Sequence, residues 1–372
     1  MPRKNDPGKN VKMKRILVAN IFGIGDVLFT TPLIASLKKE IAGVGIDYLC
    51  NARTKAAVEC DPDVDRIFVY EKDDLVDLWK KSKAGCLKSL YALFMDIKRR
   101  KYDAVFDFTL SREFGFFFTL AGIPKRIGLN YKKRGVFLTD KFAFSGFAGR
   151  HVVEYYLDLL KSLDVSPSMN RIQLVPDEKL REWATAYLRE RGAGEGPCVA
   201  VVPGGGASWG THASRKRWSP EGFSRAADIL TGAGVAAVIL GDASETDLCR
   251  KTAGMMSAKP LAVENGLKLD EYIALLSACD LILCNDGGPL HVAVALGVKT
   301  VSIFGPVDDK VYGPYPPSAG NRVITAAEIP CRPCYGRFRL PECEYDNRCL
   351  TDIDPERVAD ACMEQLRKKG NQ

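Results

Sequence analysis

The sequence predicts an α/β protein of two lobes, each built on a doubly wound parallel sheet. Its 372 residues are too many for one compact core and suit two domains of roughly 150–200 residues each. Runs rich in β-branched residues alternate with longer helical segments in both halves, the pattern of βα units on a parallel sheet. The stretch 164–177 carries two prolines and little periodicity, so we place the junction between the lobes there.

The first lobe is predicted over residues 15–170, after a solvated basic arm at residues 1–14. The apolar run 114–123 is predicted to be a core helix, and its aromatic residues leave insertion into a membrane as the alternative. The other elements follow from strand and helix periodicity. Strands are expected at 15–20, 45–50, 66–70 and 102–108, and helices near 28–41, 75–99 and 149–163.

The second lobe is predicted over residues 171–354, and a C-terminal amphipathic helix follows at 355–372. Strands are expected at 198–204, 235–241, 281–286 and 299–305, and helices near 220–232, 244–256, 270–278 and 289–296. Open parallel sheets bind ligands at the carboxyl ends of their strands, so we expect these ends of both lobes to face a cleft.

Composition indicates a globular protein with a mild preference for anions. Hydrophobic residues make up 46% and charged residues 27%, and the net charge is +7. That excess suits anionic ligands or membranes, and we expect no nucleic acid partner. The longest uncharged apolar stretch, 229–241, has thirteen residues, whereas a membrane-spanning helix needs about 20. The basic start and apolar run resemble a signal peptide, but Asp26 follows at once without a cleavage site, so we expect a cytoplasmic protein.

A glycine turn follows the first predicted strand and presents a carboxylate. Gly23 and Gly25 begin a dinucleotide fingerprint, but Leu28 occupies the third glycine position. The chain also lacks a G-K-[ST] triplet, so a P-loop is not expected. Asp26 is left either as the N-cap of the next helix or as a strand-end carboxylate that faces a cleft.

Two loops of the second lobe suit phosphate groups. The loop 203–218 combines glycines, hydroxyls and three consecutive cations, of which Lys216 is placed to neutralise a leaving diphosphate. The turn 285–291 opens a helix, where backbone amides and the helix dipole attract anions and Asp286 can accept hydrogen bonds from sugar hydroxyls. The alternative for the loop 203–218 is a solvated surface loop. The alternative for the turn 285–291 is that Asp286 caps the helix and His291 packs beneath it.

These residues give the chain a resemblance to glycosyltransferase family 9, the lipopolysaccharide heptosyltransferase group. Four blocks carry it, in the family's order along nearly the whole chain: 25–38, 203–223, 285–297 and 303–309. The resemblance implies the GT-B fold, two Rossmann-like domains with the acceptor on the first and the nucleotide-sugar donor on the second.

The resemblance also implies roles for individual residues. Asp26 matches the family's proposed general base, and Glu245 is our choice for the acid that binds the donor ribose, with Asp242 as the alternative. Gly287 and His212 stand where members often have hydroxyls. The donor-binding positions implied in this way are Thr211, His212, Lys216, Glu245, Asp286, Gly287, Gly288 and His291.

The activity we expect is inverting, metal-independent transfer of a sugar, heptose from ADP-heptose, onto a lipopolysaccharide core or related glycan. No cofactor is expected for catalysis, because no D-x-D metal motif stands at a suitable strand end. Asp63 and Asp65 form a D-x-D, but it precedes a strand and is typical of a turn. The expected acceptor is an anionic glycolipid or glycan, and basic groups at 98–101, 125–126 and 132–134 suit its phosphates or the inner face of the cytoplasmic membrane. Alternatives are a nucleotide-sugar-binding protein without catalysis and a Rossmann-type NAD(P)-dependent oxidoreductase.

Four of the twelve cysteines cluster as C-x₂-C-x₈-C-x₅-C. The other eight are scattered, which argues against a secreted disulfide scaffold. Four thiolates can hold a structural zinc ion, and an iron–sulfur cluster, two disulfides or free thiols remain open. The cluster consists of Cys331, Cys334, Cys343 and Cys349.

Overall fold

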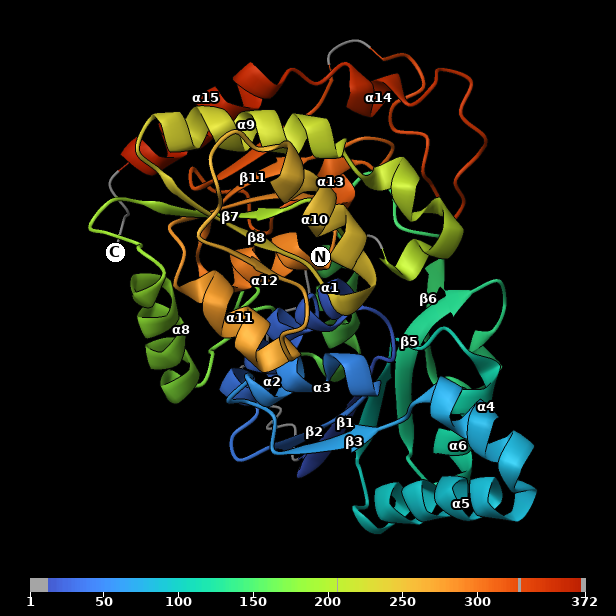
Figure 1. The fold of residues 1–372 in the computed structure, drawn as a ribbon. Coiled ribbons are helices and arrows are strands. Elements are labelled where there is room, and N and C mark those ends of the chain that lie inside the picture. Colours follow the sequence, from blue (N-terminus) through green and yellow to red (C-terminus); the bar gives the residue numbers. More distant parts are fainter. Residues whose placement is uncertain (1–12, 206, 327–328, 369–372) are drawn as a thin grey trace, which may run out of the picture. The chain divides into compact units, whose positions relative to one another are not determined.

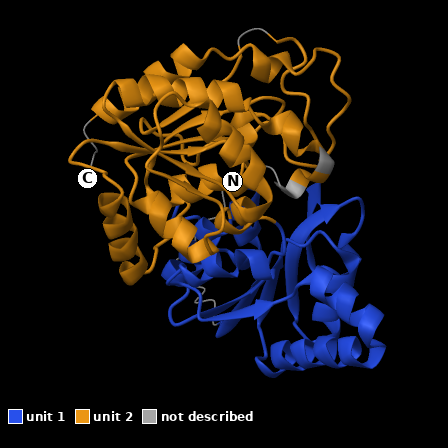
Figure 2. Ribbon diagram, in the orientation of Figure 1, with its two compact units in different colours: residues 1–22, 30–145, 154–170 blue, residues 23–29, 146–153, 171–372 orange. Residues whose placement is uncertain are grey.

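The computed structural model describes residues 13–205, 207–326 and 329–368, and the chain divides into two compact units (Figures 1 and 2). Unit 1 comprises residues up to 22, 30–145 and 154–170, and unit 2 comprises 23–29, 146–153 and 171 onward. Two short segments of the N-terminal half therefore belong to unit 2. The predicted N-terminal arm falls almost wholly on residues outside the described part.

Unit 1 is built on a parallel sheet in the order β3-β2-β1-β4-β5-β6, counted over the described residues. Its central strands are apolar without alternation because helices cover both faces of a parallel sheet. The strands are β1 (Arg15–Ala19), β2 (Gly45–Cys50), β3 (Arg66–Val69), β4 (Ala104–Asp107), β5 (Lys125–Tyr131) and β6 (Asp140–Phe144). The helices are α2 (Thr31–Glu40), α3 (Lys55–Glu59), α4 (Lys72–Lys81), α5 (Lys83–Arg99) and α6 (Arg112–Leu120), with 3₁₀ turns η1 (Ala52–Thr54), η2 (Gly135–Phe137) and η3 (Leu159–Leu163).

The structure corrects three predictions in this half of the chain. The helix expected near 75–99 is two helices, because Ser82 is extended (φ −156°, ψ 103°) and its side chain caps α5. The helix expected near 149–163 is α7 (Val152–Asp158) followed by η3. Strands β5 and β6 were not predicted, because their charged and glycine-containing sequences lack the apolar run of a central strand. The core helix at 114–123 is confirmed as α6, in which Phe118 is fully buried.

Unit 2 contains a second parallel sheet, β12-β11-β10-β7-β8-β9 in its described residues. Helices α9 and α15 pack on each other, and α8 packs on α11 (Figure 1). The strands are β7 (Cys198–Val202), β8 (Ala236–Leu240), β9 (Ala262–Glu264), β10 (Leu281–Asn285), β11 (Lys299–Ile303) and β12 (Asn321–Ile324). The helices are α1 (Ile24–Leu28), α8 (Glu178–Glu190), α9 (Pro220–Gly232), α10 (Thr246–Met255), α11 (Leu269–Ser277), α12 (Gly288–Leu296), α13 (Asp309–Tyr312), α14 (Arg348–Thr351) and α15 (Pro355–Arg367), with 3₁₀ turns η4 (Ala207–Lys216) and η5 (Ala243–Glu245).

The predicted strands and helices of the second half all form, within about two residues of the expected bounds. The predicted C-terminal helix is α15, whose Val358 and Cys362 are fully buried. The short strands β9 and β12 were not predicted, since each is an edge strand of three or four residues. Among the described residues, no helix combines the length and the apolar character needed to cross a membrane.

A buried carboxylate links three elements of unit 1. Asp47 on β2 accepts hydrogen bonds from Nε and Nη2 of Arg100, at 2.7 and 3.0 Å, and from the hydroxyl of Tyr102 at 2.5 Å. The side chain of Asp47 is 1% exposed. Arg100, which the sequence suggested as part of a basic ligand-binding group, is therefore committed to a structural ion pair.

Arg100→Ala is expected to destabilise unit 1 by about 3–5 kcal/mol, because it leaves a buried carboxylate without its cation. Urea unfolding followed by circular dichroism measures the change. The neighbouring Arg99→Ala is the matched control. Arg99 is exposed and pairs with the exposed Asp96 at 3.5 Å, so its loss should cost less than about 0.5 kcal/mol. Equal effects of the two variants would contradict the role given to Arg100.

Candidate functional site

Two glycines let α1 pack directly on α12 within unit 2. A Cβ atom at Gly25 would lie 2.6 Å from Cδ2 of His291, and a Cβ atom at Gly288 would lie 2.5 Å from Cγ2 of Ile24. Real Cβ atoms do not approach heavy atoms so closely, so larger residues would push the helices apart. This contact places the first turn of α1 beside the N-terminal turn of α12.

Asp26 lies in that first turn of α1. The N-cap is Gly23, in extended conformation, so Asp26 is not the N-cap that the sequence offered as one alternative. Burial raises the pKa of its carboxyl to about 6, although the backbone amides of Gly23 and Asp26 and the charge of Lys216 act in the opposite direction. The side chain is thus an ionised carboxylate at pH 7 with more basicity than an exposed aspartate.

The two phosphate-suited loops meet in a buried ion pair. Nζ of Lys216, at the end of η4, lies 2.7 Å from Oδ2 of Asp286, which follows β10. Both side chains are less than a tenth exposed. Nζ of Lys216 also lies 4.4 Å from the centroid of the Trp209 ring. An ammonium has three N–H donors, so Lys216 can hold Asp286 and still donate to a ligand.

Asn285, the last residue of β10, ties the loops together and was missed by the sequence analysis. Its Nδ2 donates to the carbonyl oxygens of Pro203 and Gly204, each at 2.9 Å, and its Oδ1 accepts from the amide of Trp218 at 2.8 Å. It is fully buried, and these bonds satisfy its amide group. A buried amide at the end of an apolar strand was the signal in the sequence.

Glu245 lies against the glycine loop that follows β7. Its Oε1 accepts from the amide of Gly205 at 2.7 Å and pairs with Nη2 of Arg217 at 2.8 Å. A Cβ atom at Gly204 would lie 2.0 Å from Oε2, so only glycine fits there. The alternative acid, Asp242, instead caps η5 by accepting from the amide of Ser244 at 2.7 Å. Of the two candidates, Glu245 is the one at the loop.

Two buried histidines, His291 and His151, pack against Phe29, the residue after α1, and both are neutral at pH 7. His291 on α12 packs edge-on against Phe29, with ring centroids 4.6 Å apart, and its Nδ1 has no hydrogen-bond partner among the described residues. Burial, with the charge of Lys216 and the nearby His151, lowers the pKa of His291 to about 3. His151 was missed by the sequence analysis. Its Nε2 lies 3.0 Å from the carbonyl oxygen of Gly313, and its ring stacks on Tyr315.

The remaining predicted donor positions are placed as follows. Gly287 is the N-cap of α12 and Gly288 its first residue, and no side chain in the described part of the protein caps this terminus. Its first-turn amides can therefore bind an anion. His212 is exposed. The side chain of Thr211 lies outside the part of the structure that is described.

The expected zinc or iron–sulfur site is not supported. No group of three or more His, Cys, Asp or Glu side chains in the described residues could hold a metal ion, and all four cysteines are free thiols. Cys349 instead packs in the apolar core of unit 2 beside Leu350. Sγ of Cys343 accepts from the amide of Asn347 at 3.2 Å. Among the possibilities that the spacing of the four cysteines left open, the structure therefore matches free thiols.

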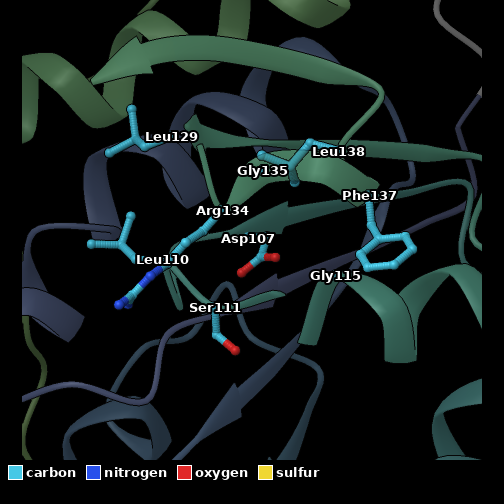
Figure 3. A pocket seen from close by; sticks show the side chains of 9 residues that line it. All are labelled: Asp107, Leu110, Ser111, Gly115, Leu129, Arg134, Gly135, Phe137 and Leu138. Carbon is cyan, nitrogen blue, oxygen red and sulfur yellow. The ribbon is translucent and has the colours of Figure 1, made fainter. Parts of the chain in front are cut away.

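Unit 1 has a pocket at the carboxyl end of β4 (Figure 3). Oδ1 of Asp107 accepts from the amide and hydroxyl of Thr109, at 2.9 and 2.6 Å, and burial raises the pKa of Asp107 to about 6. Arg134, from a predicted basic group, also lines the pocket. The lining residues are Asp107, Leu110, Ser111, Gly115, Leu129, Arg134, Gly135, Phe137 and Leu138.

Sequence comparison relates the chain to one group of enzymes. The profile of glycosyltransferase family 9 (heptosyltransferase) matches residues 90–342. Lipopolysaccharide heptosyltransferase 2 of Escherichia coli K12 is 23% identical over 356 residues, which cover 92% of this chain and 96% of that protein. Lipooligosaccharide heptosyltransferase 2 of a Campylobacter jejuni serotype O:2 strain is 29% identical over 174 residues, 44% of this chain and 49% of that protein.

Solved structures share the architecture. A glycosyl transferase family 9 protein from Veillonella parvula superposes with a TM-score of 0.79 at 23% identity, covering 97% of this chain and 99% of that one. E. coli ADP-heptose lps heptosyltransferase II gives a TM-score of 0.74 at 21% identity, covering 95% and 98%. These likenesses confirm the predicted fold class, GT-B with two Rossmann-like parallel-sheet domains.

Lys216→Met is expected to destabilise unit 2 by about 3–5 kcal/mol, because Asp286 would stay buried without its cation. The double variant Lys216→Met/Asp286→Leu should recover most of that loss, since it removes the uncompensated charge as well. Chemical unfolding of the parent, of the single variants Lys216→Met and Asp286→Leu, and of the double variant measures the coupling. A double variant that is destabilised by the sum of the two single changes would show that the pair is not coupled.

Proposed function

The chain belongs to glycosyltransferase family 9, and from this premise we propose that it transfers heptose from ADP-heptose onto a lipopolysaccharide core or related glycan, with inversion and without a catalytic metal. The observation that carries the proposal is the carboxylate of Asp26, set beside the buried Lys216–Asp286 pair in unit 2. Family membership makes the chain a glycosyltransferase, so the oxidoreductase alternative is wrong.

The relatives support the choice of donor and acceptor. Those that match most of the chain are named lipopolysaccharide or lipooligosaccharide heptosyltransferases, and the E. coli structure is that of an ADP-heptose enzyme. We assign the same donor and acceptor class to this chain. The acceptor is then an anionic glycolipid on the cytoplasmic face of the inner membrane, and the protein works in the cytoplasm with peripheral contact to that face.

The donor is proposed to bind at the carboxyl edge of the second sheet. Lys216 and the first amides of α12, at Gly287 and Gly288, would hold the diphosphate, because a cation and a helix N-terminus both favour anions. Asp286 would accept a hydrogen bond from a heptose hydroxyl. Glu245, close to the glycine loop, would accept from the ribose, and the hydroxyl of Thr211 would donate to phosphate.

The reaction we propose is a single displacement. The acceptor hydroxyl attacks the anomeric carbon from the face opposite the diphosphate, and Asp26 accepts its proton as the new C–O bond forms. The bond from the anomeric carbon to the diphosphate breaks, and its electron pair leaves on ADP. Lys216 and the α12 amides stabilise the charge that develops on the diphosphate. One carboxylate suffices for this chemistry because one proton has to be removed.

The experiment that tests the function measures nucleotide diphosphate release from a panel of nucleotide sugars, with and without a lipopolysaccharide core acceptor. Acceptor-dependent ADP release from ADP-heptose is expected. Donor binding with no turnover on any glycan acceptor would instead support the non-catalytic binding protein.

The raised pKa of Asp26 predicts that kcat/KM falls on the acid side of its pH profile, which we call the acid limb. The base must be ionised, so kcat/KM should fall tenfold per pH unit below about 6. Asp26→Asn should lose about 10²–10⁴-fold in kcat with donor affinity largely kept. The control is Asp107→Asn, which removes a second carboxyl of pKa about 6 and should leave the limb in place. A limb that disappears in this control would contradict the assignment to Asp26.

Gly25→Ala should misplace the base without unfolding the protein. The new methyl group would meet the His291 ring at 2.6 Å, so α1 must shift, and a displacement near 1 Å costs about 10²-fold in rate. Initial rates and thermal unfolding together measure this. The control is Gly254→Ala on α10, where a Cβ atom meets nothing within 4 Å and activity should be unchanged. Near-normal turnover of Gly25→Ala would refute the tight α1–α12 contact.

A further inference from the structure

The segment of residues 331–349, which we call the Cys-rich segment, is bound to the carboxyl end of β11. It leads as an orange-red loop into α14 (Figure 1). The amides of Cys334 and Tyr335 both donate to the carbonyl oxygen of Pro306, at 3.0 and 2.9 Å. Because β11 pairs with β10 in the sheet, these bonds place the segment beside the strand that leads to Asp286.

A second contact fixes the Cys-rich segment against residues 146–147. Gly146 has a positive φ of 122°, and a Cβ atom there would lie 2.7 Å from Cα of Arg337. The ring centroids of Phe338 and Phe147 are 5.7 Å apart. These residues belong to the same compact unit as β10 and β11. Glycine at position 146 therefore lets the backbone of the segment approach closely, and the segment is held at two places.

The ring of Tyr335 joins the Cys-rich segment to the lysine of the candidate site. Its centroid lies 4.6 Å from that of the Trp209 ring, with the two planes 34° apart. Nζ of Lys216 lies 4.4 Å from the centroid of the same Trp209 ring. Gly210, directly after Trp209, has φ 54° and ψ −124°, which interrupts η4. Since a continuous helix does not connect Trp209 to Lys216, the ring contact with Tyr335 helps to fix the orientation of the indole.

The Cys-rich segment meets the same loop at a further point. Burial raises the pKa of the Cys343 thiol, but two backbone amides and the guanidinium of Arg215 lower it below its usual value. The guanidinium of Arg215 thus lies next to this thiol. Arg215 is the residue before Lys216, so the segment contacts η4 both before and after the interruption at Gly210.

We propose that Tyr335 is a positioning residue for Lys216, and that the Cys-rich segment directs the ammonium toward the diphosphate of the donor through the Trp209 ring. The ion pair with Asp286 fixes the distance from Nζ to one carboxylate oxygen, but the four-carbon stem of a lysine is flexible. The face of the indole ring attracts the ammonium and supplies a second fixed point. The inference rests on the proposed function, in which Lys216 binds that diphosphate.

The place of the segment along the sheet predicts which part of the donor it affects. The strands of unit 2 include the order β11, β10, β7, β8. Glu245, to which we assign the ribose, follows β8, whereas the Cys-rich segment is bound at the end of β11. Asp286 follows β10 and lies between them. The segment should therefore affect the binding of the diphosphate and not that of the nucleoside.

The experiment measures ADP binding to the full chain and its variants by isothermal titration calorimetry. Tyr335→Leu should weaken ADP binding about tenfold, because the indole loses its ring partner and the ammonium its second fixed point. Tyr335→Phe keeps the ring and should bind within about twofold of the parent. Unchanged ADP affinity in Tyr335→Leu would overturn the proposal.

Adenosine provides a comparison ligand without the diphosphate. Its affinity, measured by saturation-transfer NMR, should be the same for the parent and for Tyr335→Leu, because the nucleoside does not contact Lys216 in the proposed arrangement. A loss of adenosine affinity equal to the loss of ADP affinity would show that the whole donor site is distorted, and the positioning role would be wrong.

A matched control separates positioning from a general loss of aromatic packing. Trp183 on α8 is half-buried like Tyr335, and its ring centroid lies 5.3 Å from that of Tyr187. Trp183→Leu should keep the ADP affinity of the parent. If it lost affinity as strongly as Tyr335→Leu, the loss of any aromatic pair in unit 2 would explain the effect, against the proposal.

Two further variants test the same contacts if Tyr335→Leu does not fold. Trp209→Phe keeps a ring near the ammonium and should retain most of the ADP affinity, whereas Trp209→Leu should lose about tenfold. Thermal unfolding of each variant identifies those that fold as the parent does. Equal ADP affinities of Trp209→Phe and Trp209→Leu would contradict a role for the ring.

A double-mutant cycle tests whether Tyr335 acts through Lys216. In the Lys216→Met/Asp286→Leu background, Tyr335→Leu should cause no further loss of ADP affinity, because the ammonium to be positioned is absent. The same fold loss in both backgrounds would show that Tyr335 acts independently of Lys216, and the proposal would fail.

These binding measurements do not depend on turnover. If Tyr335→Leu weakens ADP binding as expected but the protein does not transfer heptose, the positioning role stands and the proposed function fails. If the protein transfers heptose and Tyr335→Leu keeps the ADP affinity and kcat of the parent, only the positioning role fails. If the parent binds UDP or GDP in place of ADP, the donor assignment is wrong and the same comparison is made with that diphosphate. A parent that binds none of the three contradicts both proposals.

Discussion

The close approach of α1 to α12 is the constraint on which the candidate site depends. Only glycine leaves room for the facing side chain at these two positions: Gly25 faces His291, and Gly288 faces Ile24. Because the facing groups are the His291 ring and the Cγ2 methyl of Ile24, with no long flexible side chain between the helices, the position of α1 has little freedom. A carboxylate that follows the first strand of the chain is thereby held in unit 2, beside a helix terminus more than 250 residues further along.

Around that contact, the site is a set of buried charges that compensate one another. Adjacent strands β10, β7 and β8 end at one edge of the sheet, so Asp286, the glycine loop and Glu245 converge there. Lys216 pairs with Asp286 and Arg217 with Glu245, so each of these two buried acids has a cation beside it. Asn285 joins the loops without adding charge. Burial raises the pKa of Asp26, which makes it more basic than an exposed aspartate, and lowers the pKa of His291, which is neutral.

The two units differ in how their basic side chains are arranged. In unit 2 the cations of the site are paired: Lys216 is buried against Asp286, and the partly buried Arg217 pairs with Glu245. In unit 1, by contrast, Lys80 and Lys83 are exposed beside Trp79, and Arg134 lines an open pocket. Arg100 is the exception, because its guanidinium neutralises Asp47. A run of basic residues in the sequence therefore mixes structural cations with cations available to a ligand.

The sequence by itself determined the two-lobed α/β fold, the central strands and the two glycine loops of the candidate site, because central strands are continuous apolar runs and the glycine motifs are local. Tertiary structure alone decided the rest. Ser82 breaks a helix that periodicity predicts as one, Glu245 rather than Asp242 meets the glycine loop, Asn285 and His151 join the site, and the four spaced cysteines form no metal site. The Ser82 cap is local, but the positions of Glu245, Asn285 and His151 depend on contacts between residues distant in the chain. Spacing in the sequence carries no information about which partner such a side chain meets.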